Sequence, residues 1–227
     1  MAYLALAALY FLGIHIFVSG SRLRDTITAR TGEQGFLGLF SSLSLVGIVW
    51  VGWAYAAAPA ITLWASPLWF RPLALVLVLV AGILVVVGVT TPSPTATGFD
   101  FVWDQEEPAT GILRITRHPF LVGVALWGAT HLIASGDAAG TTLFGTMLLL
   151  GLVGPGLIDR KRSRRLGAQW ESVAAVTSVV PFAAILQGRN RFVASEIGVW
   201  RPAAACAAYA ILLGAHAWLF GVNPLSF

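Results

Sequence analysis

Residues 68–89 read LWFRPLALVLVLVAGILVVVGV, a run in which Arg71 is the one charged side chain. A helix that crosses the hydrocarbon core of a bilayer needs about 20 predominantly apolar residues, and this run has that length. Its apolar residues are continuous rather than alternating, which favours an α-helix over a strand of a membrane barrel. The stretch therefore predicts a transmembrane helix and sets the interpretation of the rest of the chain.

The composition of the whole chain agrees with a lipid environment. The sequence has 227 residues, of which 57% are hydrophobic and 11% charged, and its mean hydropathy is +0.81. A soluble domain carries about a quarter charged residues, so this chain has too few to cover a globular surface. The single cysteine, Cys206, excludes an internal disulfide and a cysteine metal cluster.

Five other apolar segments are comparable with residues 68–89. Together they predict an all-α integral membrane bundle of about six transmembrane helices, forming one domain over residues 1–227. An amphipathic helix is also expected at about 163–180, in the inner interface before the last span, because apolar residues recur there at helical spacing behind basic ones. The expected transmembrane helices are about 2–20, 36–58, 68–89, 113–135, 141–158 and 197–221.

The basic residues predict the orientation of the chain. All of them except Arg71 lie in the first, third or fifth loop or at the beginning of the last helix. Cytoplasmic loops carry an excess of Lys and Arg, so these loops are expected in the cytoplasm and both termini outside. We therefore expect a multi-pass protein of a bacterial inner membrane, with periplasmic termini, surrounded by membrane lipid. The same pattern accounts for the positive charge without a nucleic-acid partner.

The four histidines are the first candidate site, since each lies in or at the end of a predicted helix. Ionisable groups inside a membrane are energetically costly and usually functional, although a single histidine can also simply bridge two helices. Histidines on facing helices of a bundle are ligands of b-type haem. We therefore predict that at least one pair binds a metal cofactor. The histidines are His15, His118, His131 and His216.

The depth of each histidine in the membrane limits which of them can form a pair. The helical rise places His15 about 5 Å to the cytoplasmic side of the midplane and His118 near the inner interface. It places His131 about 6 Å and His216 about 9 Å to the outer side. Depth alone favours His131 with His216, followed by His15 with His118. Helix ends predicted from sequence shift by a few residues, so both pairings stay open.

The sequence RITRHP at residues 114–119 is the second candidate site. Arg114, Arg117 and His118 are expected within one helical turn at the cytoplasmic surface. Guanidinium groups bind carboxylates and phosphates, so this group can bind an anion such as a haem propionate. The alternative is that these residues only enforce the topology and contact lipid phosphate.

Three long stretches of the chain resemble the NnrU family and, within it, the plant and cyanobacterial 15-cis-ζ-carotene isomerases. The matching stretches occur in order and together span most of the length of the chain. They are FLGIHIFVSGSRLRD at 11–25, GILRITRHPFLVGVALWGATHLIASGD at 111–137 and DRKRSRRLGAQWESVAAVTSVVPFAAILQGR at 159–189.

The resemblance implies a membrane protein with haem b and a redox-dependent cis–trans isomerisation of an apolar polyene lipid. It implies that His15 and His131 are the catalytic haem ligands. The isomerases have a cysteine, implicated in their iron chemistry, three residues before the match to His131, where this chain has Gly128. Bacterial NnrU proteins are associated with nitrite and nitric oxide metabolism in denitrification, which implies an accessory or sensor protein as an alternative.

A further resemblance implies a different class of enzyme. RHPFLVG at 117–123, followed by LWG, is similar to a segment of the membrane isoprenylcysteine carboxyl methyltransferases. In those enzymes this segment helps to bind S-adenosylmethionine near the cytoplasmic face. The implied roles of Arg117 and His118 would then be in binding that cofactor, without haem.

Overall fold

The computed structural model describes residues 1–19, 21–93, 95, 107 and 109–226. Within these residues the regular structure is helical, apart from one isolated antiparallel bridge between Thr62 and Asp137, which confirms the predicted all-α class. The helices are α1 (Ala2–Gly13), the π-helix η1 (Ile14–Ser19), α2 (Arg22–Ala56), α3 (Phe70–Thr90), α4 (Ile112–Ile115), α5 (Pro119–Ser135), α6 (Ala138–Leu166), α7 (Ala168–Val176), α8 (Ala183–Leu186), α9 (Ala194–Ile197) and α10 (Trp200–Phe220).

Four of these helices, α2, α3, α6 and α10, are long and apolar enough to cross a membrane. Two shorter apolar segments accompany them, Ala2–Val18 and α5. The fold is therefore that of a multi-pass membrane protein. The expectation of about six spans stays a prediction, because it depends on the two shorter segments.

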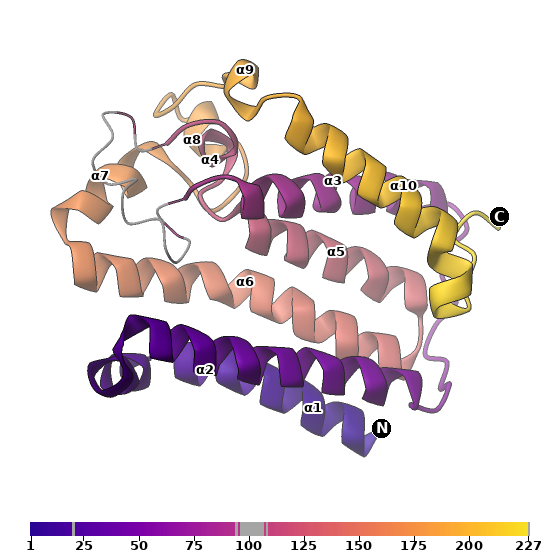
Figure 1. The fold of residues 1–227 in the computed structure, drawn as a ribbon. Helices are drawn as coiled ribbons and strands as arrows, with labels where there is room; N and C mark the ends of the chain where they lie inside the picture. Colours follow the sequence, from indigo (N-terminus) through magenta and orange to yellow (C-terminus); the bar gives the residue numbers. More distant parts are fainter. Residues whose placement is uncertain (20, 94, 96–106, 108, 227) are drawn as a thin grey trace.

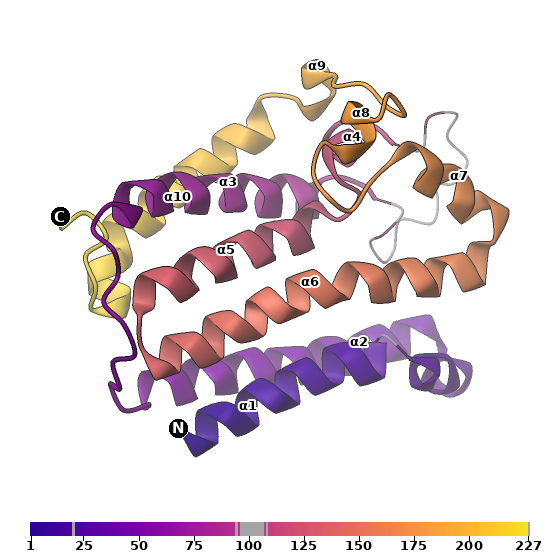
Figure 2. The same ribbon diagram turned by 180° about the vertical axis from the view of Figure 1, so that it is seen from behind.

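The long helices lie side by side in a bundle (Figure 1). Helix α5 packs between α3 and α6, α6 also packs against α1, and α10 packs on α3. Figure 2 shows from behind that α1 and α2 cover the face of α6 that is turned away from α5. Both chain termini lie at one end of the bundle, here called the termini end, whereas α4, α7 and α8 lie at the opposite end, here called the loop end.

The second helix is longer than predicted, because the expected first loop is helical. Helix α2 begins at Arg22 rather than near residue 36, and Gly32, with φ 75° and ψ 169°, interrupts it. The kink separates a polar first part from the apolar span. Hydropathy detects only the apolar part, which explains why the helical first part was missed.

The predicted helix at 113–135 is in fact two helices, and the expectation that it runs through RITRHP is wrong. Helix α4 ends at Ile115, and α5 begins at Pro119. Proline suits the first turn of a helix but disfavours helical geometry in the residue before it. The chain between the helices pairs instead with a distant segment, since Arg117 N donates to Ser178 O at 2.9 Å and Phe182 N to Ile115 O at 2.8 Å.

The predicted helices at 141–158 and 163–180 have different boundaries in the structure. Helix α6 continues to Leu166 and includes the basic residues that were placed in a loop. Arg and Lys are good helix formers, so the helix extends beyond its apolar part. Helix α7 is shorter than predicted and ends before Thr177, which is extended. The last helix begins at Trp200, after the separate short helix α9.

Glycines allow α5 and α6 to approach each other closely. A Cβ atom at Gly128 would lie 2.8 Å from both Leu148 N and Phe144 O of α6, closer than carbon can pack. Small residues at such positions are typical of helix contacts in membranes. The position of α5, which carries His131, therefore depends on a residue without a side chain.

Gly136 holds the turn after α5 against the segment before α3. Its carbonyl accepts hydrogen bonds from Leu63 N at 2.8 Å and Trp64 N at 3.0 Å, and its φ is 67°. L-residues with side chains rarely adopt this conformation. A Cβ atom there would also lie 2.2 Å from Trp64 O.

We predict that Gly136→Ala destabilises the protein by about 1–3 kcal/mol, because the backbone would be strained and the turn displaced. Thermal unfolding of the detergent-solubilised protein measures the effect. Gly82→Ala is the matched control, since that helical glycine has open space around its Cβ position and Ala favours helix. Equal unfolding midpoints for the two variants would contradict the prediction.

Candidate functional site

His15 lies in η1, directly after α1. Its Nδ1 is 2.8 Å from Phe11 O. Its ring centroid is 4.4 Å from that of Phe11 in α1 and 5.2 Å from that of Phe40 in α2. No hydrogen bond of its Nε2 occurs within the described part of the chain. Short π-helical segments are frequent at functional sites, because they turn side chains out of the regular helical pattern.

His131 lies near the end of α5 in a similar environment. Its Nδ1 is 3.0 Å from Trp127 O, and its ring centroid is 4.7 Å from that of Trp127 and 4.9 Å from that of Phe144 on α6. Its Nε2 likewise has no hydrogen-bond partner among the residues described. The imidazole therefore lies among aromatic rings contributed by two helices.

His216 lies near the end of α10. Its Nδ1 is 2.8 Å from Val222 O, and its ring contacts Phe220. The last turns of α5 and α10 both lie at the termini end of the bundle, as Figure 1 shows. The structure thus brings His131 and His216 to the same end.

His15 lies farther from the termini end than His131 does. Helix α1 begins at the termini end and leads to η1, so His15 follows the whole length of α1. Helix α5 runs toward the termini end, and His131 is four residues before its last residue, Ser135.

These three histidines share one hydrogen-bonding pattern. In each, Nδ1 faces a backbone carbonyl, which can only accept, so Nδ1 carries the proton and Nε2 keeps its lone pair. Histidines that bind metals usually donate their other ring N–H to a carbonyl or carboxylate in this way. The tautomer and orientation are thus those of a potential metal ligand.

His118 has the opposite arrangement. It is buried at the loop end, and its Nε2 lies 2.7 Å from Asp159 Oδ1 of α6. Arg117 donates to the other oxygen of this carboxylate from Nε at 3.0 Å and from Nη2 at 2.5 Å. The structure therefore does not bring His118 to His15, and the nitrogen that would bind a metal is already used.

Arg114 is buried among acceptors that belong to the chain itself. Its Nε and Nη2 donate to the two oxygens of Glu196 at 2.7 Å and 2.8 Å, and Nη2 also donates to Glu107 at 2.6 Å. Its Nη1 donates to Asn190 at 2.8 Å. The hydrogen bonds from Arg114 lower the pKa of Glu196 to about 2, and the amide of Gly111 adds to this effect.

The RITRHP residues therefore have internal carboxylate partners. Binding of an external anion to Arg114 and Arg117 stays a prediction, and such an anion would have to compete with Glu196 and Asp159. Sequence reasoning missed these two acids, although each stands alone in or beside a strongly basic segment. An isolated acid in such a segment is the signal that indicates an internal ion pair.

Non-haem metal sites usually need three or more side-chain ligands. No group of three or more His, Cys, Asp or Glu side chains placed to hold a metal ion occurs among the described residues. Haem iron needs only one or two axial side chains, because the porphyrin supplies the other ligands.

Known proteins resemble the chain at two levels. Residues 3–224 match the family described as NnrU protein. The chloroplastic 15-cis-zeta-carotene isomerase of Arabidopsis thaliana is 40% identical over 81 residues, which are 36% of this chain and 22% of that protein. That of Zea mays is 38% identical over 82 residues, with the same shares. The match thus spans less than a quarter of each curated relative. No solved structure matches the chain.

The Arg114–Glu196 ion pair gives an expected dependence of stability on pH. The pKa of Glu196 lies below its ordinary value of 4.5, at about 2, so the folded state favours the carboxylate. Its contribution to stability is complete above pH 4.5 and is lost as the pH falls through 2. We predict that Glu196→Gln lowers the thermal unfolding midpoint at pH 7, and that its difference from wild type shrinks toward pH 2.

The matched control is Glu171→Gln, since Glu171 is exposed on α7. This control should stay within the small effect of a surface substitution at both pH values. A difference between Glu196→Gln and wild type that does not change with pH would contradict the assignment.

Proposed function

The chain belongs to the NnrU family, and on that premise we propose that it is a haem-b-binding membrane protein that isomerises an apolar polyene in a redox-dependent reaction. The observation that carries the proposal is the shared state of His15, His131 and His216, with Nδ1 donating to a carbonyl and Nε2 open. Bound haem supplies an iron centre that changes redox state and coordination. The histidines orient and hold it.

The surroundings of the histidines suit a flat apolar ring system. Phe11 and Phe40 contact His15, and Trp127 and Phe144 contact His131. Aromatic side chains pack well against other ring systems. An apolar shell also excludes water and so influences the redox potential of a bound iron.

His131 is the proposed ligand in either pairing. The family resemblance supports His15 as its partner, whereas the position of the last turns of α5 and α10 at the same end of the bundle supports His216. His118 is not proposed as a ligand, because its Nε2 donates to Asp159.

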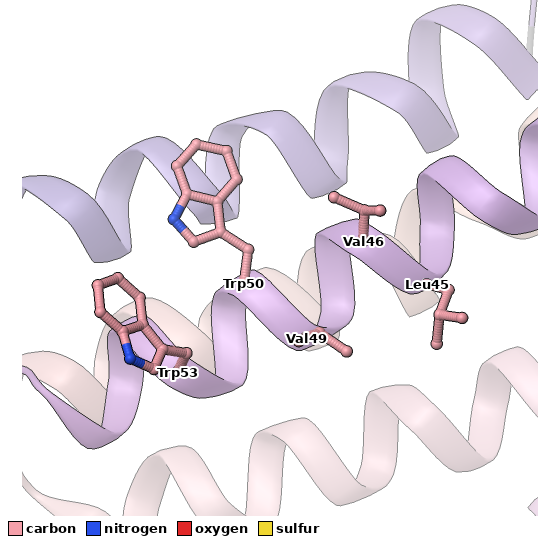
Figure 3. A pocket seen from close by; sticks show the side chains of 5 residues that line it. All are labelled: Leu45, Val46, Val49, Trp50 and Trp53. Carbon is pink, nitrogen blue, oxygen red and sulfur yellow. The ribbon is translucent and has the colours of Figure 1, made fainter.

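The proposed substrate is an apolar polyene that reaches the protein through the lipid. The support is the local identity with the 15-cis-zeta-carotene isomerases and the apolar exterior of the bundle. An apolar hollow of about 400 Å³ lies on α2, against which an extended hydrocarbon can pack. Figure 3 shows the side chains that line it. The residues that line it are Leu45, Val46, Val49, Trp50 and Trp53.

We further infer the orientation of the protein in a bacterial inner membrane. The loop end, where the basic part of α6 meets α4 and α7, would face the cytoplasm, and both termini would be periplasmic.

One observation favours a second candidate function, an accessory or sensor protein of nitrite and nitric oxide metabolism with the same haem. The cysteine implicated in the isomerase chemistry corresponds to Gly128, and the backbone of α6 leaves no space for a side chain there. The haem site can exist without this thiol. The S-adenosylmethionine-dependent methyltransferase is less well supported, since Asp159 already binds Arg117 and His118.

We predict that the detergent-purified protein, produced with adequate haem supply, shows a Soret band that shifts on dithionite reduction. His131→Ala should lose the band, because the proposed ligand is removed, whereas His118→Ala should keep it. Spectra of His15→Ala and His216→Ala then identify the second ligand. A colourless wild-type protein, or an unchanged spectrum for His131→Ala, would overturn the proposal.

Isomerase activity has a separate test. Co-expression in the dark with enzymes that accumulate 15-cis-ζ-carotene should convert it to the isomer with a trans central bond, and His131→Ala should not. Chromatography of the pigments measures the ratio. An unchanged isomer ratio in cells whose protein carries haem would favour the accessory or sensor function.

A further inference from the structure

Large apolar side chains are exposed at the loop end, outside the helices that can cross a membrane. On α2, α3 and α10 such exposure is expected, because those helices can face lipid. Residues 177–199 lie between α7 and α10 and belong to none of these spans. Six apolar residues there and at the beginning of α10 have 47% to 84% of their surfaces exposed, and they are here called the loop-end patch. They are Val180, Phe182, Leu186, Phe192, Val199 and Trp200.

The loop-end patch differs from the amphipathic helix that the sequence predicts at 163–180. In α7, the large apolar residues Trp170 and Val173 are buried inside the protein. The exposed residues of α7 are small or polar. The apolar surface therefore follows α7 along the chain instead of forming one of its faces. An exposed apolar patch outside the spans indicates an interaction site.

Buried contacts hold the segment that carries the patch against α4, whose four residues are all buried. Phe182 N donates to Ile115 O at 2.8 Å. Farther along the segment, Asn190 and Glu196 both accept hydrogen bonds from Arg114. Figure 1 shows α4 and α8 next to each other at the loop end. The patch is therefore part of a fixed surface, because the backbone on both sides of α8 is tied to the interior.

Phe182 has a backbone conformation that is unusual for an aromatic residue. Its φ is 63° and its ψ is −5°, and it is the one described residue other than glycine with a positive φ. This region favours glycine, because a side chain crowds the backbone there. Burial inside the protein does not offset the strain, since 47% of Phe182 is exposed. An apolar partner outside the protein would offset it.

Basic side chains border the patch. Arg189 and Arg191 lie between α8 and α9, and both are exposed. Arg201 follows Trp200, and its guanidinium carbon is 5.0 Å from the centroid of the indole ring. The Nε of Arg201 is buried without a hydrogen-bond partner in the described part of the chain. Aromatic residues beside arginines are typical of the membrane–water interface.

The patch is also continuous with the membrane-crossing part of the protein. Helix α10 begins at Trp200, the last residue of the patch. Helix α8 contacts α4, which packs against the loop-end parts of α3 and α5. A surface beside the ends of spanning helices lies where the hydrocarbon core meets the headgroups. The one acid in residues 180–201 is Glu196, which Arg114 binds, so the charge of this surface suits anionic headgroups.

We propose that the loop-end patch inserts into the headgroup region of the leaflet at the loop end, where Arg189, Arg191 and Arg201 bind the phosphates of anionic lipids. Amphipathic surfaces of this kind bury their apolar side chains to a shallow depth, while their basic side chains contact lipid phosphate. The partner is a lipid surface rather than a protein, because the patch adjoins the beginning of α10 and combines aromatic residues with arginine. This anchoring is independent of the proposed haem and isomerase function.

The test places a nitrobenzoxadiazole fluorophore at one position of the patch. Full-length protein with Cys206→Ser and Leu186→Cys is labelled and reconstituted into phosphatidylcholine bilayers, since Cys206 is exposed and Leu186 is the most exposed residue of the patch. The matched control is Ser172→Cys in the same background, at an exposed position of α7 outside the patch. Doxyl lipids quench a label inside the bilayer, whereas iodide quenches a label in water.

Doxyl lipids should quench the label at position 186 and iodide should not, with the reverse result at position 172. The reason is that only the patch side chain is expected below the headgroups. Iodide quenching at 186 equal to that at 172 would overturn the proposal and would favour a protein partner for the patch. If Leu186→Cys does not fold, Phe192→Cys replaces it in the same comparison.

The arginines have a separate readout with the same label. At equal mole fraction, doxyl phosphatidylglycerol should quench the label at 186 more strongly than doxyl phosphatidylcholine, because anionic lipid gathers at the basic side chains. Arg191→Gln/Arg201→Gln should lose this preference. Arg22→Gln/Arg164→Gln should keep it, since it removes the same charge at exposed positions of α2 and α6. A preference that is absent from the wild type, kept by the first variant or lost by both would overturn the role of the arginines.

Discussion

The Arg114–Glu196 ion pair is the interaction that holds the loop end of the bundle together. It joins α4 to the segment before α10, two parts of the chain that are 82 residues apart. Helix α10 is almost entirely exposed along its length and packs mainly on α3. The beginning of α10 is therefore held through Glu196, whereas farther along the helix Tyr209 Oη donates to Leu75 O of α3 at 3.0 Å. The two carboxylate oxygens bind two nitrogens of one guanidinium, which restrains both distance and orientation.

The two ends of the bundle use histidine and arginine in different ways. At the loop end, Asp159 of α6 binds both Arg117 and His118, which directly precede α5. The guanidinium and the imidazole there hold α5 against α6 instead of facing a ligand. In the apolar part, His15 and His131 satisfy only Nδ1, through the carbonyl four residues earlier in the same helix. The first arrangement stabilises the fold. The second leaves a lone pair open inside the membrane, which is what a metal ligand requires.

Much of the fold could be predicted from the sequence, and the exceptions have physical causes. The helix predicted at 68–89 corresponds to α3, with bounds that differ by only one or two residues. A long apolar stretch has few alternatives to a helix in a bilayer, because its backbone groups must be hydrogen-bonded within the segment. The helical first part of α2 was not predicted, because a polar helix has no hydropathy signal. Pro119 is a local signal for the break before α5, but the pairing of the extended segment with Ser178 and Phe182 is a long-range contact that no local pattern reveals.

The sequence by itself determined the all-α class, the segments apolar enough for the membrane and the family, because each is a property of local residues or of their order. It also indicated the four histidines as candidate ligands of a cofactor. Only the tertiary structure decided that three of them keep Nε2 without a hydrogen bond to any described residue while His118 does not, and that Arg114 and Arg117 are neutralised by Glu196 and Asp159. These outcomes depend on contacts between distant parts of the chain, and the free energy of a buried charge is set by the partner it meets there.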